Sequence, residues 1–312
     1  MKLFGTSSAI AARTLDELRA EEGSTSLGRV LTLIAVVRDE QGLATAKEAA
    51  AGAARAHPAR IIILHPDNPK NCSPEPLGEN AAQLDAELIV GGEAGMAEIV
   101  ILKPYCGAGS NLASLVMPLL LPDAPTITWW VQEAPSAPSK TDLGKVSTRR
   151  ITTSNNTRNP VAALTALAAT YADGDTDLAW AATTLWRGHL AAMLDEPPHE
   201  PVRRVEVTGN LVRGGVNMLA AWLRLRLGVP VEILEGPGSG IDAVRIIRDS
   251  GSFELARPTH EAIGTLSRDG REDVQVRLPM RSFEAMLIEE LRTLGADHEY
   301  ADVLANGLSM LF

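Results

Sequence analysis

The sequence predicts an α/β protein with two domains: an N-terminal domain with a mostly parallel, Rossmann-like sheet and flanking helices, and a C-terminal domain of mixed α/β type. Short runs of β-branched residues alternate with alanine-rich or amphipathic segments along the chain, which is typical of strands joined by helices. A length of 312 residues also suggests two domains. Because a Pro- and Ser-rich stretch begins at Ala134, we expect the domains to cover residues 1–150 and 151–312.

The first half of the chain alternates strands and helices. An amphipathic helix surrounds Leu15 and Leu18, and the nearly continuous apolar run at 29–37 is typical of a strand covered on both faces. The elements that follow are a helix at 44–56, strands at 59–64, 86–91 and 97–102, a helix at 111–121 that Pro118 should kink or end, and a strand at 126–131. The first two strands and their helix form a β-α-β unit, whose crossover should be right-handed.

The second half of the chain is more mixed. Its predicted elements are helices at 158–171 and 177–194, a strand at 204–208, a helix at 216–227, strands at 229–234, 243–248, 253–257 and 274–278, and closing helices at 283–294 and 298–308. We interpret Arg149 and Arg150, between the two halves, as part of a solvated linker. The paired carboxylates Glu289 and Glu290 should lie on a helix surface.

Composition narrows the possible partners. The net charge of −10 argues against nucleic acid, which requires a basic surface. No stretch approaches the length of a membrane span, and the N-terminus has no secretory signal. The two cysteines, Cys72 and Cys106, are too few for a disulfide framework. We therefore expect a cytoplasmic protein.

Motifs for catalysis, metals and cofactors are absent from the sequence. There is no phosphate-binding G-x-x-x-x-G-K-[ST] loop and no G-x-S-x-G nucleophile elbow, and the Gly-rich stretch at 91–98 precedes a strand, unlike a dinucleotide fingerprint. The six histidines have no ligand spacing, and no cysteine pair supports zinc. We expect no metal site and no cofactor, and the case for an enzyme is weakened.

Two adjacent tryptophans end the predicted strand at 126–131. Side chains alternate between the faces of a strand, so Trp129 joins the apolar face while Trp130 lies among threonines. Trp130 also stands at the carboxyl end of its strand, the edge where open α/β sheets bind ligands and partners. We therefore predict that Trp130 is exposed and contacts a partner. The alternative, that a second layer covers Trp130, stays open.

A third tryptophan raises the same question in the predicted helix at 177–194. On a helical wheel Trp186 lies on the apolar stripe, whereas Trp180 falls on the opposite side near Arg187. Asp175 or Asp177 can cap this helix. A large apolar side chain outside the stripe needs a second surface to cover it, which is either the first domain or another protein.

These residues give two candidate sites. The predicted partner-binding surface combines aromatic and charged residues: Asp123, Trp130, Asp175, Asp177, Trp180 and Arg187. The densest basic cluster, Arg149 and Arg150 with Arg158, is the alternative candidate, as a phosphate-binding site.

Several long stretches resemble a known family. They are similar to the actinobacterial form of the glucose-6-phosphate dehydrogenase assembly protein family, OpcA. The similar stretches are LLLPDAPTITWW, RRITTSNNTRNP, YADGDTDLAWAATTLWRGHLAAMLDEPP, LRAEEGSTSLGRVLTLIAVV and HPARIIIL. The resemblance covers nearly the whole chain in order. It implies an N-terminal and a C-terminal domain, and a non-enzymatic protein that supports assembly or activation of the NADP-dependent dehydrogenase at the entry to the oxidative pentose phosphate pathway.

The resemblance implies an assembly factor or activator that binds glucose-6-phosphate dehydrogenase and so supports NADPH supply. The residues also leave open an alternative function, in which an α/β protein binds a sugar phosphate or nucleotide as a sensor or an enzyme. A homo-oligomer is also possible. Some relatives are linked to redox control through cysteines. For Cys72 and Cys106 we expect two free structural thiols rather than a switch.

Overall fold

The computed structural model describes residues 1–21, 30–66, 84–91, 98–105, 109, 111–197, 199–258 and 261–311. They form two compact units, and each unit combines two separate stretches of chain. The first contains Met1–Thr152 with Phe283–Gly295, and the second contains Thr153–Ser282 with Ala296–Phe312. The predicted free thiols Cys72 and Cys106 lie outside the described residues.

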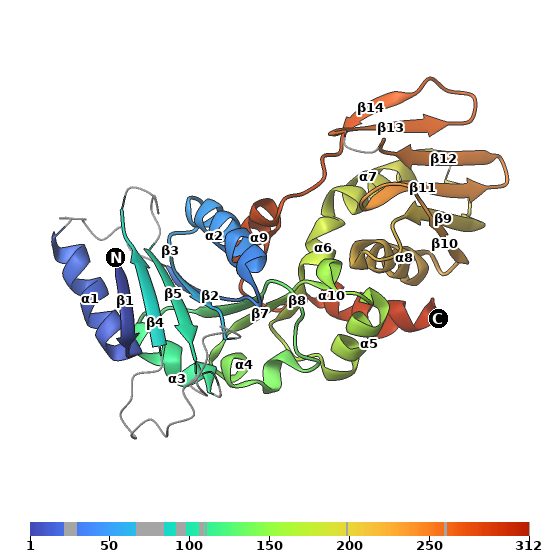
Figure 1. The fold of residues 1–312 in the computed structure, drawn as a ribbon. Coiled ribbons are helices and arrows are strands. Elements are labelled where there is room, and N and C mark those ends of the chain that lie inside the picture. The colour runs from blue at the N-terminus through green and yellow to red at the C-terminus, as the bar shows by residue number, and fades with distance from the viewer. Residues whose placement is uncertain are drawn as a thin grey trace. The chain divides into compact units, whose positions relative to one another are not determined.

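The first unit is built around a Rossmann-like sheet (Figure 1). Its strands follow the order β1 (Lys2–Thr6), β4 (Leu84–Ile89), β5 (Glu98–Pro104), β3 (Ala59–Leu64), β2 (Leu31–Val36), β6 (Thr126–Trp130) and β7 (Arg149–Thr152). The strands from β5 to β7 are parallel to one another. At one edge β4 pairs antiparallel with β5, and β1 pairs antiparallel with β4. From β2 the chain builds one side of the sheet through β3 and β5, and then the other through β6 and β7. The strand order therefore reverses between β2 and β6.

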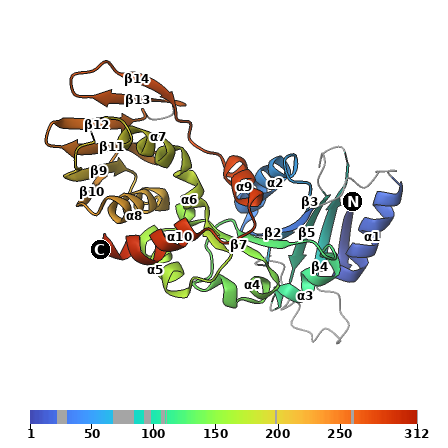
Figure 2. The ribbon, with the colours of Figure 1, turned by 180° about the vertical axis from the view of Figure 1, so that it is seen from behind.

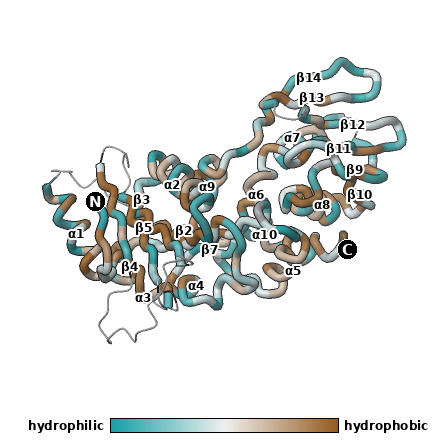
Figure 3. Tube along the Cα trace, in the orientation of Figure 1, coloured by the Kyte–Doolittle hydropathy of each residue, from teal (hydrophilic) through white to brown (hydrophobic). Residues whose placement is uncertain are grey.

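Helices cover both faces of this sheet, which explains its apolar central strands. The described residues of the unit contain the α-helices α1 (Ser8–Glu21), α2 (Glu40–Ala54), α3 (Leu112–Val116), α4 (Asp142–Val146) and α9 (Phe283–Arg292). All six residues of β3 are buried, and β2 and β3 are hydrophobic along their length (Figure 3). Leu15 of α1 shares one core with Ile62 of β3, while α2 packs against α9 on the opposite face.

The second unit has a mixed sheet of six strands with one covered face. The order is β10 (Val231–Glu235), β9 (Arg204–Gly209), β11 (Ile241–Arg248), β12 (Gly251–Ala256), β13 (Ile263–Arg268) and β14 (Val274–Arg277) (Figure 2). Among the strands that the structure describes in this sheet, β9 and β10 pair in parallel and the other neighbours pair antiparallel. The helices are α5 (Pro160–Thr170), α6 (Leu178–Ala182), α7 (Thr184–Leu194), α8 (Gly214–Leu227) and α10 (His298–Asp302), with a short strand β8 (Asp175–Asp177).

Burial alternates along the strands of the second sheet. Val244 and Ile246 of β11 are fully buried in a core that includes residues of α7 and α8. Arg245, between them, is exposed on the other face. This alternation is typical of a sheet with one packed and one open face.

The predicted α/β architecture is confirmed, but several elements differ from the predictions. The interpretation of Arg149 and Arg150 as a solvated linker is wrong, because both belong to the buried strand β7. Glu290 is buried rather than on a helix surface. The single helix predicted at 177–194 is two helices, α6 and α7, which meet at Thr183.

Four strands of the described residues were not predicted at all: β1, β7, β8 and β13. The structure also places 283–295 in the first unit, although the predicted domain 151–312 contains it. Among the described residues, no helix has the length and apolarity that crossing a bilayer requires.

Candidate functional site at the carboxyl edge of the first sheet

A cavity of about 330 Å³ opens at the carboxyl edge of the first sheet. Val36 and Val37 at the end of β2, and Trp130 at the end of β6, form one wall. Leu112 of α3 and Leu143 of α4 contribute further apolar surface. The cavity therefore lies where the strand order reverses, which is where open α/β sheets usually bind their ligands.

The rim of the cavity carries charges of both signs. Arg38 and Glu133 form an ion pair across it, and about half of each side chain is exposed. Asp142 at the start of α4 adds another exposed carboxylate. An apolar interior with a mixed-charge rim suits an apolar side chain surrounded by polar groups, as at the core and rim of a protein interface.

The N-terminus of α2, beside the cavity, is capped by the protein's own carboxylate. The backbone N–H of Gly42 donates a hydrogen bond of 2.7 Å to Asp39 Oδ1, and Gln132 Nε2 donates one of 3.0 Å to Asp39 Oδ2. These two hydrogen bonds, that from Gly42 being the stronger cause, hold the pKa of Asp39 below its usual value. In dinucleotide-binding folds, the helix after the first strand uses these N–H groups to bind phosphate.

Gln132 also explains the glycine in the first turn of α2. A Cβ atom at Gly42 would lie 2.4 Å from Gln132 Oε1, and the same oxygen accepts a 2.8 Å hydrogen bond from the backbone N–H of Arg38. Gly42 thus lets Gln132 lie over the helix terminus. A further carboxylate, Glu40, accepts a hydrogen bond from Lys103, which lowers the pKa of Glu40. The arrangement resists a phosphate at this helix, because carboxylates occupy the place of the anion.

Trp130, predicted to be exposed, is buried. Only 5% of its surface is accessible, and it packs in the core that includes Leu15 and Leu143. The alternative that the sequence left open, that a second layer covers Trp130, is therefore the correct one. Trp130 nevertheless forms part of the cavity wall, so the predicted position at the carboxyl edge is retained.

Trp180, expected to be covered by the first domain or by another protein, is buried in a core cluster of the second unit. Its Nε1 donates a 2.8 Å hydrogen bond to Asp297 Oδ2, and its ring lies 6.2 Å from that of Tyr300. The guanidinium carbon of Arg187 stands 3.5 Å from the Trp180 ring centroid. The helical wheel failed here because α6 ends at Thr183, so the angle of Trp186 in α7 does not apply to Trp180.

The remaining predicted partner-binding residues do not come together. Asp177 is fully buried and caps α6, accepting hydrogen bonds from Ser154 and the backbone N–H of Ala179. Asp175 closes a turn by accepting from the N–H of Ala172. Asp123 is exposed before β6, at the opposite end of that strand from Trp130, and has a left-handed backbone with φ of 58°.

The alternative phosphate-binding cluster is divided between the interior and the surface. Arg149 pairs with the buried Glu290 and donates to the carbonyl of Gly295. Arg150, also buried, donates to the carbonyl of Ser147 at 2.9 Å. Arg158 is exposed. Two of the three guanidinium groups therefore bind structural partners within the first unit.

The features that define the carboxyl edge, Asp39, Gln132 and the Arg38–Glu133 pair, were not singled out from the sequence. One signal was present: Asp39 and Glu40 immediately precede an alanine-rich run, which is a helix N-terminus signature. Within the described residues, no group of His, Cys, Asp or Glu side chains could hold a metal ion.

Comparison with known proteins identifies the family of the chain. A family model described as the glucose-6-phosphate dehydrogenase subunit N-terminal domain matches residues 50–169, and one described as the corresponding C-terminal domain matches residues 173–304. The sequence matches no curated protein.

Among solved structures, the chain is similar to aldose-aldose oxidoreductase from Caulobacter crescentus in complex with glycerol, with 12% identity, a TM-score of 0.50, and coverage of 91% of this chain and 96% of that chain. It also matches an oxidoreductase from Sinorhizobium meliloti, with 10% identity, a TM-score of 0.45 and coverage of 91% and 95%. At 12% identity, the similarity to the first of these structures concerns the fold alone. The two family models together match most of the chain, and the protein therefore belongs to the OpcA-type family of glucose-6-phosphate dehydrogenase assembly proteins.

Proposed function

We propose that the protein is a non-enzymatic assembly factor or activator that binds glucose-6-phosphate dehydrogenase and supports its oligomerisation or activity. The match of both family models to the chain is the observation that carries this proposal. The capping of α2 by Asp39 supports it, because it disfavours a nucleotide phosphate at the expected position. A cytoplasmic location remains part of the proposal.

The partner contact that we propose is the cavity at the carboxyl edge of the first sheet. An apolar side chain of the dehydrogenase would enter between Leu112 and Trp130, and polar groups around it would meet Arg38, Glu133 and Asp142. Interface energy usually concentrates where an anchoring side chain fills a pocket and its rim excludes water. Trp130 would then act as the wall of the receiving pocket, rather than as the protruding anchor predicted from the sequence.

Two variants of the cavity test this contact. Leu112→Trp should fill the cavity, and Glu133→Lys reverses the charge at the rim, where loss of an exposed ion pair has little effect on folding. Both should weaken binding to the dehydrogenase, measured by mass determination of the co-purified complex, and reduce its activation. Asp123→Lys is the matched control, because it reverses an exposed carboxylate at the opposite end of β6.

The outcomes distinguish the site from the function. If only Asp123→Lys weakens the complex, the cavity is the wrong contact. If wild-type protein neither binds nor activates the dehydrogenase, the proposed function is wrong. NADPH formation by the protein alone, from glucose 6-phosphate and NADP, would favour an enzyme instead.

A further inference from the structure

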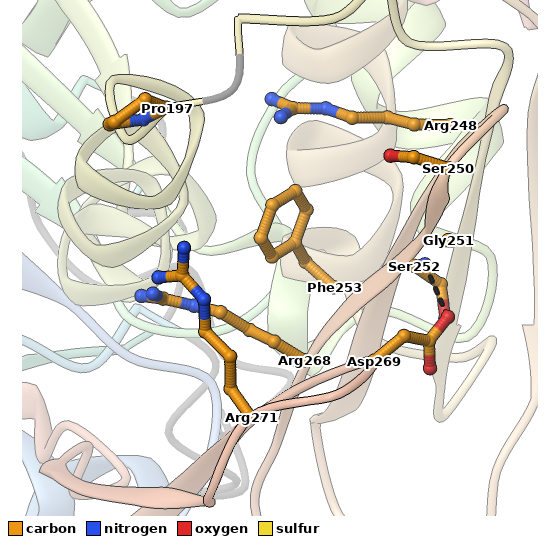
Figure 4. A pocket seen from close by; sticks show the side chains of 9 residues that line it. All are labelled: Pro197, Arg248, Ser250, Gly251, Ser252, Phe253, Arg268, Asp269 and Arg271. Carbon is orange, nitrogen blue, oxygen red and sulfur yellow. Dashed lines mark hydrogen bonds between the residues drawn. The ribbon is translucent and has the colours of Figure 1, made fainter.

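A second pocket lies in the second unit, on the inner face of its sheet. It has a volume of about 90 Å³ and is lined by residues from β11, β12, β13 and the turn after β13. Three of its lining residues are arginines, Arg248, Arg268 and Arg271, and they surround Phe253 (Figure 4). The sequence analysis did not single out this group.

The strand register explains why these side chains meet. Phe253 of β12 lies opposite Ile246 of β11 on one side and Arg268 of β13 on the other. Directly opposed residues share a face, and Arg248 shares the face of Ile246 because it is two residues further along β11. Since Ile246 is in the core, both arginines lie on the inner face.

Two of the guanidinium groups lie near the ring of Phe253. The Cζ atoms of Arg248 and Arg268 lie 4.6 and 5.7 Å from the ring centroid, and such cation–π contacts orient a guanidinium plane. In Figure 4 the ring lies between Arg248 and the converging ends of Arg268 and Arg271. Packing on the Phe253 ring therefore orients both guanidinium groups.

The lining of the pocket contains three arginines and one carboxylate, Asp269. Arg268 and Arg271 share a further carboxylate: Arg268 binds Glu196 through both Nη atoms, with Nη2 donating to Oε1 at 2.6 Å, and Arg271 Nη1 is 3.9 Å from Glu196 Oε2. Asp269, the carboxylate that lines the pocket, accepts a 2.7 Å hydrogen bond from the backbone N–H of Ser252. In the described part of the chain, the buried Nε of Arg268 has no hydrogen-bond partner.

We propose that this pocket binds a phosphate group, either free or at the end of a phosphate monoester. Arginine forks match the geometry of phosphate oxygens and form charge-assisted hydrogen bonds with them. A bound dianion would relieve the repulsion between the neighbouring guanidinium groups and accept hydrogen bonds from the exposed guanidinium of Arg271. The small volume fits one phosphate group, with the rest of a monoester outside the pocket.

The test uses the purified full-length protein and two probes at constant ionic strength. Inorganic phosphate and glucose 6-phosphate are titrated separately, with glucose as the control for the sugar, and the Nε–Hε signals of the arginines are followed by NMR. Saturable shifts of the Arg268 signal are expected with phosphate. Tighter binding of glucose 6-phosphate than of phosphate would identify a monoester site, and equal affinity would identify a site for the phosphate group alone.

Two variants and one control locate the binding. Arg271→Gln should weaken phosphate binding about tenfold, the effect of losing one charge-assisted hydrogen bond. Its side chain is mostly exposed, so the thermal unfolding midpoint should not change. Arg268→Lys keeps the charge but loses the fork, and should also weaken binding. Arg245→Gln removes an equal charge from the opposite face of the same sheet and should leave binding unchanged.

Two results would overturn the proposal: no saturable binding of either probe to the wild-type protein, or an equal loss of affinity in Arg245→Gln and Arg271→Gln. Because the dehydrogenase is absent from these measurements, their failure would not bear on the proposed assembly function.

Discussion

The two sheets of this protein bury their strands differently. In the first unit all six residues of β3 are buried, because helices cover both faces of a parallel sheet. In the second unit β11 alternates, with Val244 and Ile246 buried and Arg245 exposed between them. The difference shows that burial follows different rules in the two units: it extends along whole strands in the first and is confined to one face in the second.

The largest loss of stability is expected when a buried charge of the first unit loses its partner. Replacing Glu290 with Gln removes the carboxylate that pairs with Arg149, which is itself only 3% exposed. Leaving one partner of a buried pair without its counter-charge costs about 3–5 kcal/mol. Urea unfolding followed by tryptophan fluorescence measures the loss.

The control is the exposed pair of Arg203 and Asp249 in the second unit. Asp249→Asn should change the free energy of unfolding little, because solvent screens exposed pairs. Equal losses in the two variants would contradict the contrast between the units.

Removal of the hydrogen bond between a buried indole and a helix-capping carboxylate should give the next largest loss of stability. Asp297 accepts from Trp180 Nε1 and also from the backbone N–H of Tyr300 at the start of α10. Asp297→Ala should lower the free energy of unfolding by about 1–3 kcal/mol. Asn159→Ala, which removes only the cap of α5, should cost less. If the two cost the same, the indole bond contributes nothing to stability.

Small truncations test the two faces of each sheet directly. Ile61→Val and Ile62→Val remove a methylene from opposite faces of β3, where both residues are fully buried. Each should cost about 0.5–1.5 kcal/mol. In β11, Ile246→Val should cost as much, and Ile247→Val less, because Ile247 lies on the open face. A comparable cost at Ile247, measured by urea unfolding, would show that something covers that face.

The smallest effects concern two carboxylates with lowered pKa values. Hydrogen bonds from Gly42 and Gln132 lower the pKa of Asp39, and those from Arg203 lower that of Asp249. A folded pKa below the unfolded value, about 3.9, gives stability that is present above the unfolded pKa and is lost as the pH falls through the folded pKa. Asp39→Asn should therefore flatten the decline in stability at acid pH.

High salt should affect the pKa values of these two carboxylates differently. The partners of Asp39 are uncharged amides, so 1 M NaCl should leave its pKa low. The partner of Asp249 is an exposed arginine, so the same salt should move its pKa back toward the usual value. Carboxyl ¹³C NMR titration measures both, and an equal response to salt would contradict this assignment of causes.

The sequence predicts the first sheet better than the site beside it. Strands with continuous apolar runs, such as 29–37 and 59–64, were found because burial on both faces leaves a strong hydrophobic pattern. Strand β7 was missed because two of its four residues are arginines. Arg150 binds the nearby carbonyl of Ser147, but the burial of Arg149 depends on Glu290 and on the carbonyl of Gly295, and a local pattern cannot show partners more than 100 residues away.

The two tryptophans show a second limit. Its position at the end of a predicted strand placed Trp130 on the correct edge of the sheet, but the sequence could not show that the side chain packs among Leu15 and Leu143. The wheel misplaced Trp180 because it assumed one helix through Thr183, whose hydroxyl instead donates to the carbonyl of Trp180 at 2.7 Å. The arginine pocket could not be predicted for a related reason. Its side chains are brought together by the pairing register of neighbouring strands, which a local sequence pattern does not show.

The segment 283–295 belongs to the first unit although the second unit lies between it and residue 152. During translation, Arg149 therefore emerges from the ribosome long before Glu290, its buried counter-ion. A nascent chain that stops before α9 has the strands of the first sheet but lacks this helix and Phe283, whose ring lies 6.0 Å from Trp129. Folding of the first unit can be completed only after most of the second has been synthesised.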